Sequence, residues 1–243
     1  MDPIENPVNI FWWLIYPYVT MTIMIGGLLY RYAFRQLSWA APSTEFFEKK
    51  WLRIGSPLFH WGIILAFIGH VMGIIIPLNW YHAIGITDDM YYILAFTGGG
   101  IASIMVMAGL IILLIRKVVF DPVRIHASFA DFFSVVALLL VAGSGTYITL
   151  VYNVGENHYD YREAIGPWFR SLFIFKPEYV LMAGSPLLFK IHIASAFGLF
   201  AAIPFTNLIH FTSVPVTYPT RSPQQYRARD HYKNEPPSYE NAD

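Results

Sequence analysis

The chain has 243 residues, of which 56% are hydrophobic and only 13% are charged. Soluble domains carry about 25% charged residues, so this composition indicates a membrane protein. The formal net charge is zero and the chain has no stripe of basic residues, which argues against a nucleic-acid partner. The sequence contains no cysteine, and this excludes disulfides, thiolate metal sites, iron–sulfur ligation and covalent c-type haem attachment.

Five segments are long and apolar enough to span a bilayer as helices, which takes roughly 20 residues. The first starts after Asp2 and Glu5 instead of basic residues and is too long for a signal peptide, so we interpret it as a retained helix. The sequence therefore predicts an all-α fold, a five-helix transmembrane bundle over residues 1–211. The spans are predicted near residues 9–30, 54–77, 90–115, 132–155 and 187–211.

Three further regions have compositions of their own. The connector 156–190 has mixed charge and many aromatic residues, as a helix lying at the membrane interface would. Residues 212–243 are rich in Pro, Tyr, Ser and charge, which predicts a cytoplasmic tail that is disordered without a partner. The three glycines at 98–100 predict close packing against another helix or a flat ligand.

The distribution of basic residues predicts the orientation of the bundle. Twelve of the 16 Lys and Arg residues lie between the first two helices, after the third helix or in the tail, and the other four lie in the 156–190 connector. Cytoplasmic loops of membrane proteins carry the excess of Lys and Arg. The N-terminus is therefore predicted outside, and the C-terminus is predicted in the cytoplasm.

Four of the eight histidines lie inside predicted spans. His60 and His70 on the second helix are about 15 Å apart along its axis, and His192 and His210 on the fifth are about 27 Å apart on one face. The two helices run in opposite directions. If they are neighbours, His60 meets His210 at the inner depth and His70 meets His192 at the outer depth.

Two cross-helix pairs of imidazoles, with no carboxylate or thiolate beside them, are what bis-histidine haem b requires. Zinc or copper fits less well, because each pair supplies only two ligands. Gly62, Gly69 and Gly73 would let a porphyrin approach the helix backbone. Helix–helix hydrogen bonds and a proton path are the alternatives, although proton relays usually use Asp or Glu, and neither residue occurs inside the predicted spans.

Haem propionates are anions and need basic partners near the membrane edge. Candidates for the inner haem lie just before the predicted second helix and just after the predicted third helix, and one candidate for the outer haem precedes His192 by two residues. These residues are Arg53, Arg116, Lys117 and Arg124 for the inner haem and Lys190 for the outer haem.

Short motifs around the four histidines carry a resemblance to a known family. They are S-x-L-F-H-x-G-I from Ser56 to Ile63, F-x-G-H from Phe67 to His70, K-I-H at 190–192 and P-F-x-x-L-I-H-x-x-S-V-P from Pro204 to Pro215. In these motifs the chain resembles the gamma subunit of bacterial respiratory nitrate reductase, from the first helix to about Arg221.

The resemblance implies a dihaem cytochrome b in a bacterial or archaeal cell membrane. His60 and His210 would ligate the iron of the inner haem b, and His70 and His192 that of the outer haem b. The chain would oxidise menaquinol or ubiquinol from the quinone pool at the outer side and pass electrons through the two haems to a cytoplasmic iron–sulfur beta subunit. A molybdenum-containing alpha subunit would then reduce nitrate, with no nitrate site on this chain.

The resemblance implies a quinol site near Gly69 and His70. Members of the family carry a Lys that assists quinol binding shortly after the second helix, whereas this chain reads Thr-Asp-Asp-Met at 87–90. Two other functions remain open at this point. One is the cytochrome b subunit of a related reductase of the sulfite-reduction or heterodisulfide type, and the other is a non-redox membrane transport or assembly protein.

Overall fold

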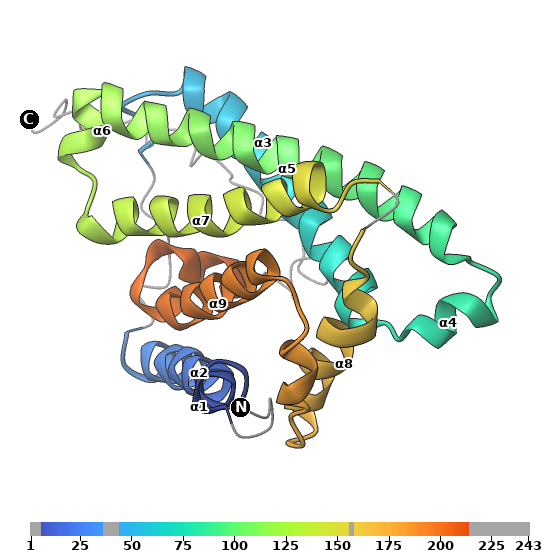
Figure 1. The fold of residues 1–243 in the computed structure, drawn as a ribbon. Helices are drawn as coiled ribbons and strands as arrows, with labels where there is room; N and C mark the ends of the chain where they lie inside the picture. Colours follow the sequence, from blue (N-terminus) through green and yellow to red (C-terminus); the bar gives the residue numbers. More distant parts are fainter. Residues whose placement is uncertain (1–5, 36–43, 156–157, 214–243) are drawn as a thin grey trace, which may run out of the picture. The chain divides into compact units, whose positions relative to one another are not determined.

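Every regular element in the described part of the chain is a helix. The computed structural model describes residues 6–35, 44–155 and 158–213 (Figure 1). In these residues five helices are long and apolar enough to cross a membrane, so the predicted all-α, five-helix fold is confirmed. These spans are Pro7–Phe34, Lys50–Ile75, Asp88–Val119, Phe129–Tyr152 and Leu187–Phe205. The prediction for the tail 212–243 lies outside the described residues from 214 onward.

Several of the long helices contain a π-helical or 3-10 turn. The elements in chain order are α1 (Pro7–Ile10), the π-helix η1 (Phe11–Ile15), α2 (Tyr16–Phe34), α3 (Lys50–His70), the π-helix η3 (Val71–Ile75), α4 (Leu78–Ala83), α5 (Asp88–Val119), α6 (Asp121–Ile125), α7 (Phe129–Tyr147), the π-helix η4 (Ile148–Tyr152), α8 (Tyr161–Phe173), the 3-10 helix η5 (Tyr179–Met182), α9 (Leu187–Ala202) and the 3-10 helices η6 (Ile203–Phe205) and η7 (Asn207–Ser213).

Side-chain caps fix where the two central helices begin. The Thr87 hydroxyl accepts a hydrogen bond from the Met90 N–H at 3.3 Å, which caps α5. Ser128 and Asp131 form a reciprocal capping box at the start of α7. Both caps satisfy backbone N–H groups that the first turn of a helix leaves without a partner.

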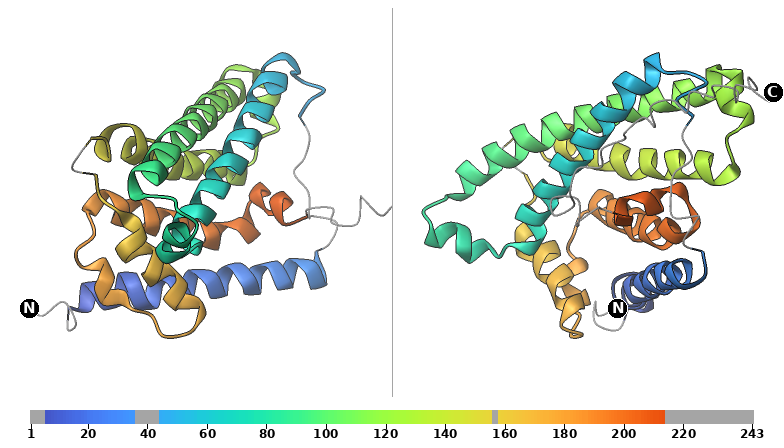
Figure 2. Two further views of the ribbon diagram at one scale, coloured as in Figure 1. Left: turned by 90° about the vertical axis from the view of Figure 1, so that its right-hand side faces the viewer. Right: turned by 180° about the vertical axis from the view of Figure 1, so that it is seen from behind.

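Helices α3 and α5 lie side by side with their backbones close together (Figure 2). A Cβ atom added at Gly109 would lie 2.5 Å from the backbone nitrogen of Phe59, and one added at Gly62 would lie 2.8 Å from that of Val106. Only glycine permits this approach. On the far side of α5 lies α7, and α9 packs between α7 and α2. Gly99 and Gly100 face η4, which agrees with the predicted helix packing of the glycine run.

The antiparallel helices define two ends of the bundle. We call the end where α3 begins and α5 ends the His60 end. The other end, where α3 passes into η3 and α4, is the His70 end. Helix α8 packs against η3 at the His70 end, where Arg170 donates a hydrogen bond to the Ile74 carbonyl at 2.7 Å.

The 156–190 connector contains α8, and the apolar side of this helix is buried within the chain. Trp168 and Leu172 have no exposed surface. The Trp168 indole donates to the Trp13 carbonyl at 2.9 Å, and the Tyr18 hydroxyl donates to the Leu172 carbonyl at 2.9 Å. The connector therefore joins the first helix to the rest of the His70 end.

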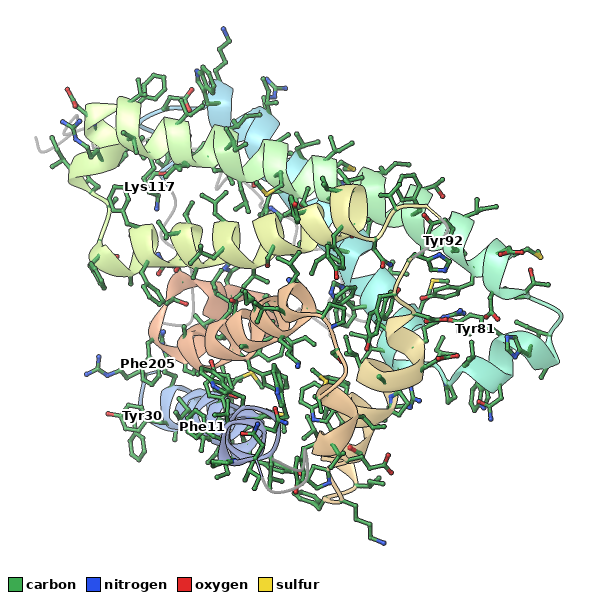
Figure 3. The ribbon with its side chains drawn as sticks, viewed as in Figure 1. Phe11, Tyr30, Tyr81, Tyr92, Lys117 and Phe205 are labelled. Atoms are coloured by element: carbon green, nitrogen blue, oxygen red, sulfur yellow. The ribbon has the colours of Figure 1, made fainter. Side chains whose placement is uncertain are left out.

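Large apolar side chains cover the outward faces of the spans. Tyr30 and Phe205, for example, are 54% and 67% exposed (Figure 3). In water this much exposed apolar surface would be unusual for a monomer, whereas lipid tails are an apolar solvent. The exposed surface therefore agrees with the spans expected from composition.

The fifth span departs from the prediction. The sequence predicted one helix over 187–211, but the α-helix ends at Ala202 and 3-10 turns follow. Pro204 explains the break, because its nitrogen has no hydrogen to donate to the carbonyl one turn earlier. The prediction that His192 and His210 share one face of a continuous α-helix is therefore wrong, because His210 lies on η7.

Candidate functional site

The four histidines of the predicted spans form two pairs between α3 and the α9–η7 segment. The ring centroids of His60 and His210 lie 6.1 Å apart, and those of His70 and His192 also lie 6.1 Å apart. Two imidazoles that share one metal have ring centres about 6 Å apart, given metal–nitrogen bonds of about 2.0 Å and the distance from each nitrogen to its ring centre. Both pairs therefore have the spacing of a metal held between two histidines.

All four rings direct Nδ1 at a backbone carbonyl. A carbonyl oxygen can only accept, so Nδ1 carries the proton and the lone pair lies on Nε2. Metal-binding histidines typically have this second hydrogen bond, which fixes the tautomer and the ring orientation. The distances are 2.7 Å from His60 to Ser56, 2.7 Å from His70 to Ala66, 3.1 Å from His192 to Val141 and 2.5 Å from His210 to Asn207.

The His192 ring rests against α7. A Cβ atom added at Gly145 would lie 3.0 Å from Cε1 of His192, so this glycine leaves room for the ring. The Ser144 hydroxyl lies 3.0 Å from Nδ1 of His192. The sequence analysis assigned no part of the site to α7. The small residues at 143–145 were nevertheless a signal that another group packs closely against this helix.

The three glycines predicted to admit a flat ligand have different surroundings. A Cβ atom at Gly73 would lie 2.6 Å from the Tyr161 ring, and Gly62 faces α5, so both make room for protein atoms. The prediction for these two glycines is wrong. Gly69 has no atom within 4 Å of an added Cβ, so it leaves space next to His70.

The donor set at each pair fits haem better than zinc. Within 6–35, 44–155 and 158–213, no three His, Asp or Glu side chains are grouped where they could hold a metal ion. A protein zinc site usually has three or four protein ligands, whereas bis-histidine haem needs two because the macrocycle supplies the others. The spacing, the tautomer and the space beside Gly69 are all compatible with haem.

Most of the basic residues predicted to meet propionates bind other protein groups. Of the five candidates, Arg53 lines an open pocket at the His60 end, together with Ser56, whose carbonyl holds His60. Arg53 is therefore the best placed of the five candidates. The other four contact protein groups as follows: Arg116 binds Glu48 and Thr44, Lys117 pairs with Asp131, Arg124 pairs with Asp121, and Lys190 donates to the Ala183 carbonyl.

Contacts with α5 and α7 hold the segment that carries His210. The Asn207 side chain donates to Asp131 on α7, and the Asn207 carbonyl holds the His210 ring. Lys117 on α5 approaches Asp131 at 3.3 Å, and Figure 3 shows it beside α7. Asp131 thus fixes the segment that carries His210. The Ser-x-x-Asp spacing at 128–131 was a signal for the capping box, whereas the contact of Asp131 with Asn207 joins residues 76 positions apart.

Comparison with known proteins identifies relatives over most of the chain. Residues 9–229 match the family described as nitrate reductase gamma subunit. The chain is 42% identical to the nitrate reductase gamma chain of Bacillus subtilis (strain 168), over 89% of this chain and 97% of the relative. It is 38% identical to the nitrate reductase-like protein NarX of Mycobacterium tuberculosis (strain ATCC 25618 / H37Rv), over 90% of this chain and 34% of that protein. It is 30% identical to the respiratory nitrate reductase 1 gamma chain of Escherichia coli (strain K12), over 91% of this chain and 98% of that protein.

The matched region contains all five candidate spans except the first residues of the first, and it contains all four paired histidines. It also contains the motifs on which the resemblance was predicted, and the predicted resemblance is confirmed. The identities to the gamma chains from Bacillus subtilis and Escherichia coli extend over nearly the whole length of those proteins. This chain belongs to the nitrate reductase gamma subunit family.

Proposed function

We propose that the chain is the quinol-oxidising subunit of a membrane-bound nitrate reductase and that each histidine pair ligates one haem b. The observation that carries the proposal is the geometry of the two pairs, each with ring centroids 6.1 Å apart and each ring fixed through Nδ1. Two bound haems would supply one-electron carriers at two depths of the bundle.

The residues of the chain prepare each pair for this role. The carbonyls of Ser56 and Ala66 hold His60 and His70 in the tautomer whose Nε2 carries the lone pair. His60 with His210, and His70 with His192, would each hold one haem iron. A haem held by two histidines would supply electron transfer without oxygen binding.

We assign the His70 end to the outer side of a bacterial or archaeal cell membrane and the His60 end to the cytoplasm, with the N-terminus outside. Quinol, either menaquinol or ubiquinol, would bind near Gly69 and His70. The chain would deliver electrons at the His60 end to an iron–sulfur beta subunit, which serves a molybdenum-containing alpha subunit. Moving a charge across the membrane works against about 2.3 kcal/mol per 100 mV, so this direction of transfer conserves energy.

The proposal predicts that quinol reduces the chain and that nitrate reoxidises it. Under anaerobic conditions, a quinol added to the purified complex should produce the absorption bands of reduced b-type haem, and nitrate should remove them. A colourless chain would support the transport or assembly function instead. Bands that sulfite or a heterodisulfide removes, and nitrate does not, would support a related reductase.

The orientation predicts the activity of a reporter enzyme that works only outside the cytoplasm. Fused after Asp243, the reporter should be inactive, because the C-terminus is assigned to the cytoplasm. Inserted at Lys176, between α8 and η5, it should be active. The reverse pattern would place the His70 end in the cytoplasm and contradict oxidation of quinol at the outer side.

A further inference from the structure

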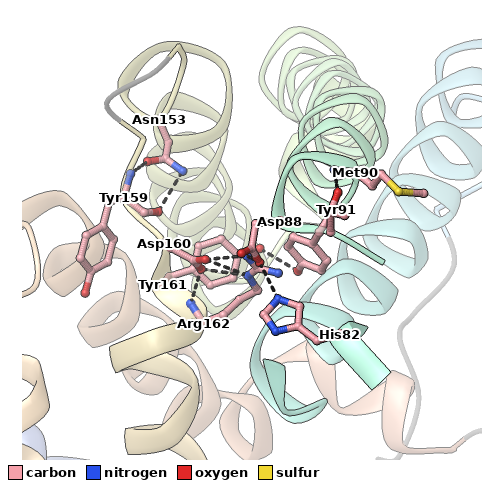
Figure 4. A network of polar contacts seen from close by, with 10 residues as sticks. His82, Asp88, Met90, Tyr91, Asn153, Tyr159, Asp160, Tyr161 and Arg162 are labelled. Atoms are coloured by element: carbon pink, nitrogen blue, oxygen red, sulfur yellow. Dashed lines mark hydrogen bonds and ion pairs between the residues drawn. The ribbon is translucent and has the colours of Figure 1, made fainter. Parts of the chain in front are cut away.

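A cluster of polar side chains joins α4, α5 and α8 at the His70 end (Figure 4). Arg162 lies at its centre, where Nη2 is 2.5 Å from Asp160 and 2.8 Å from Asp88. The guanidinium also lies over the Tyr91 ring, 4.1 Å from its centroid. We call this set the polar cluster; its members are His82, Asp88, Tyr91, Asp160, Tyr161 and Arg162.

The buried end of the polar cluster lies close to the outer histidine pair. The hydroxyls of Tyr91 and Tyr161 are 3.2 Å apart. A Cβ atom added at Gly73 would lie 2.7 Å from the Tyr161 oxygen and 2.9 Å from the Tyr91 oxygen, so both hydroxyls touch this part of the backbone. Gly73 follows His70 by three residues, which is less than one helical turn.

The other end of the polar cluster is exposed. The side chain of Arg162 is 4% exposed and that of Asp160 is 25% exposed. The side chains of Asp88 and His82, which approach to 3.2 Å, are 57% and 48% exposed. The cluster therefore runs from buried hydroxyls near His70 to a carboxylate at the surface.

A small pocket borders the polar cluster. It has a volume of about 80 Å³, and Tyr91, Tyr161, Asp160 and Arg162 contribute to its walls. Nη1 of Arg162 is buried and has no hydrogen-bond partner among the residues that the structure describes. A buried water needs polar partners and roughly 10–15 Å³, while a cavity of about 150 Å³ holds benzene. The pocket is therefore suited to several waters and too small for a quinol ring.

The charges of the polar cluster favour proton transfer toward its carboxylates. Burial disfavours the charged form of Arg162, but Asp160 and Asp88 outweigh this effect and raise its pKa above the ordinary value, so it remains a cation. Burial also raises the pKa of the Tyr161 phenol, which therefore keeps its proton at neutral pH. The groups of the polar cluster that can take up a proton are therefore Asp160, Asp88 and His82. Hydrogen bonds from His82 and Arg162 favour the charged form of Asp88, so Asp88 readily releases a proton to water.

We propose that the polar cluster is the route by which the protons of quinol leave the protein, an inference that rests on the proposed function. A purely structural clamp would explain the ion pairs and the N-cap of α8, but it would not explain the buried Nη1 of Arg162, which has no partner among the described residues. The hydroxyls, the water-sized pocket and the exposed Asp88 form a sequence of groups that can each pass a proton.

The transfer balances as follows. One quinol loses both O–H bonds and becomes one quinone, two electrons and two protons. Each electron goes to a one-electron acceptor of the proposed function. Each proton moves onto the Tyr161 hydroxyl while the proton of that hydroxyl moves to pocket water. From the pocket water a proton then passes to Asp160 and Asp88 and is released to water outside. Every group thereby returns to its starting state.

The test compares Asp160→Asn with Glu163→Gln in the complete complex reconstituted into vesicles. Asparagine keeps the N-cap of α8 and an oxygen for Arg162, but it cannot take up a proton. Glu163 is an exposed carboxylate in the first turn of the same helix and lies outside the polar cluster. Stopped-flow absorbance would measure the rate at which quinol reduces the haem of each variant, in H₂O and in D₂O, with and without formate.

Asp160→Asn should slow this reduction by about 100-fold, the typical effect of losing a proton-transfer group, and should increase the solvent isotope effect. Formate, a small proton carrier, should restore part of the rate. Glu163→Gln should behave as the wild type. A loss of packing alone would produce neither the larger isotope effect nor the rescue.

Each outcome has a definite consequence. A wild-type complex that quinol does not reduce would overturn the proposed function itself. A wild type that quinol reduces, with Asp160→Asn as fast as Glu163→Gln, would overturn only the proton route. The dithionite-reduced spectrum shows whether Asp160→Asn has lost haem. If it has, Asp88→Asn takes its place as the test variant, with its neighbour Asp89→Asn as the control. Reduction rates and formate rescue are then compared between these two variants.

Discussion

Replacing His192 by Ala should remove one of two haems and leave quinol unable to reduce the haem that remains. His70 alone offers one imidazole, and one ligand would not hold the macrocycle against lipid. Because quinol is proposed to bind at the His70 end, its electrons would lose their first acceptor. Haem content and stopped-flow absorbance of the purified His192→Ala complex measure both effects.

Two comparisons separate this effect from general damage. A small viologen that donates directly to the cytoplasmic subunits should still drive nitrate reduction in the His192→Ala complex. His126→Ala is the matched control, since its Nδ1 also bonds a carbonyl, that of Pro122, but its ring stacks on Phe47. Normal reduction of the remaining haem by quinol in the His192→Ala complex would place the quinol site elsewhere.

Replacing His210 by Ala should remove the other haem and interrupt the opposite step. Quinol should still reduce the haem at the His70 end, because His70 and His192 are unchanged. Nitrate should no longer reoxidise that haem, since the carrier next to the cytoplasmic subunits is missing. Quinol-linked turnover should therefore fall close to zero, while the absorption of one haem still responds to quinol.

The order of the two steps is tested by comparing the two variants. Loss of quinol reduction in His210→Ala, with retention in His192→Ala, would reverse the assignment of the two ends. His126→Ala again serves as the control and should keep both haems and both steps. Equal behaviour of the two histidine variants would show that the two pairs do not act in sequence.

The helical fold was predictable because the sequence places long apolar runs between charged connectors. The ends of the helices were not predictable from apolarity alone. Helix α5 starts at Asp88 because Thr87 caps it, and this start includes two acidic residues that a hydropathy pattern excludes. The end of α9 at Ala202 depends on Pro204, whose effect an apolar pattern also does not register.

The histidine pairing was predictable because antiparallel helices match residues by depth. The pairing agrees with the structure even though α9 ends before His210. The depth of a residue depends on the direction in which its segment runs, and the 3-10 turns after α9 keep that direction. The supporting contacts were not predictable. Asp131 and Asn207 are 76 residues apart, and Asp88 and Arg162 are 74 residues apart, so only tertiary packing brings either pair together. The polar cluster was missed for this reason.

The number of haems per chain tests the central claim most directly. The proposed function assigns one haem b to each of the two histidine pairs, whose rings are equally spaced, and so expects two haems for each copy of this chain. A pyridine haemochrome assay on the purified complex should give two b-type haems per chain, and acid acetone should extract both because the chain has no cysteine to bind them covalently. A value of zero or one haem per chain would contradict the assignment of both histidine pairs as haem ligands.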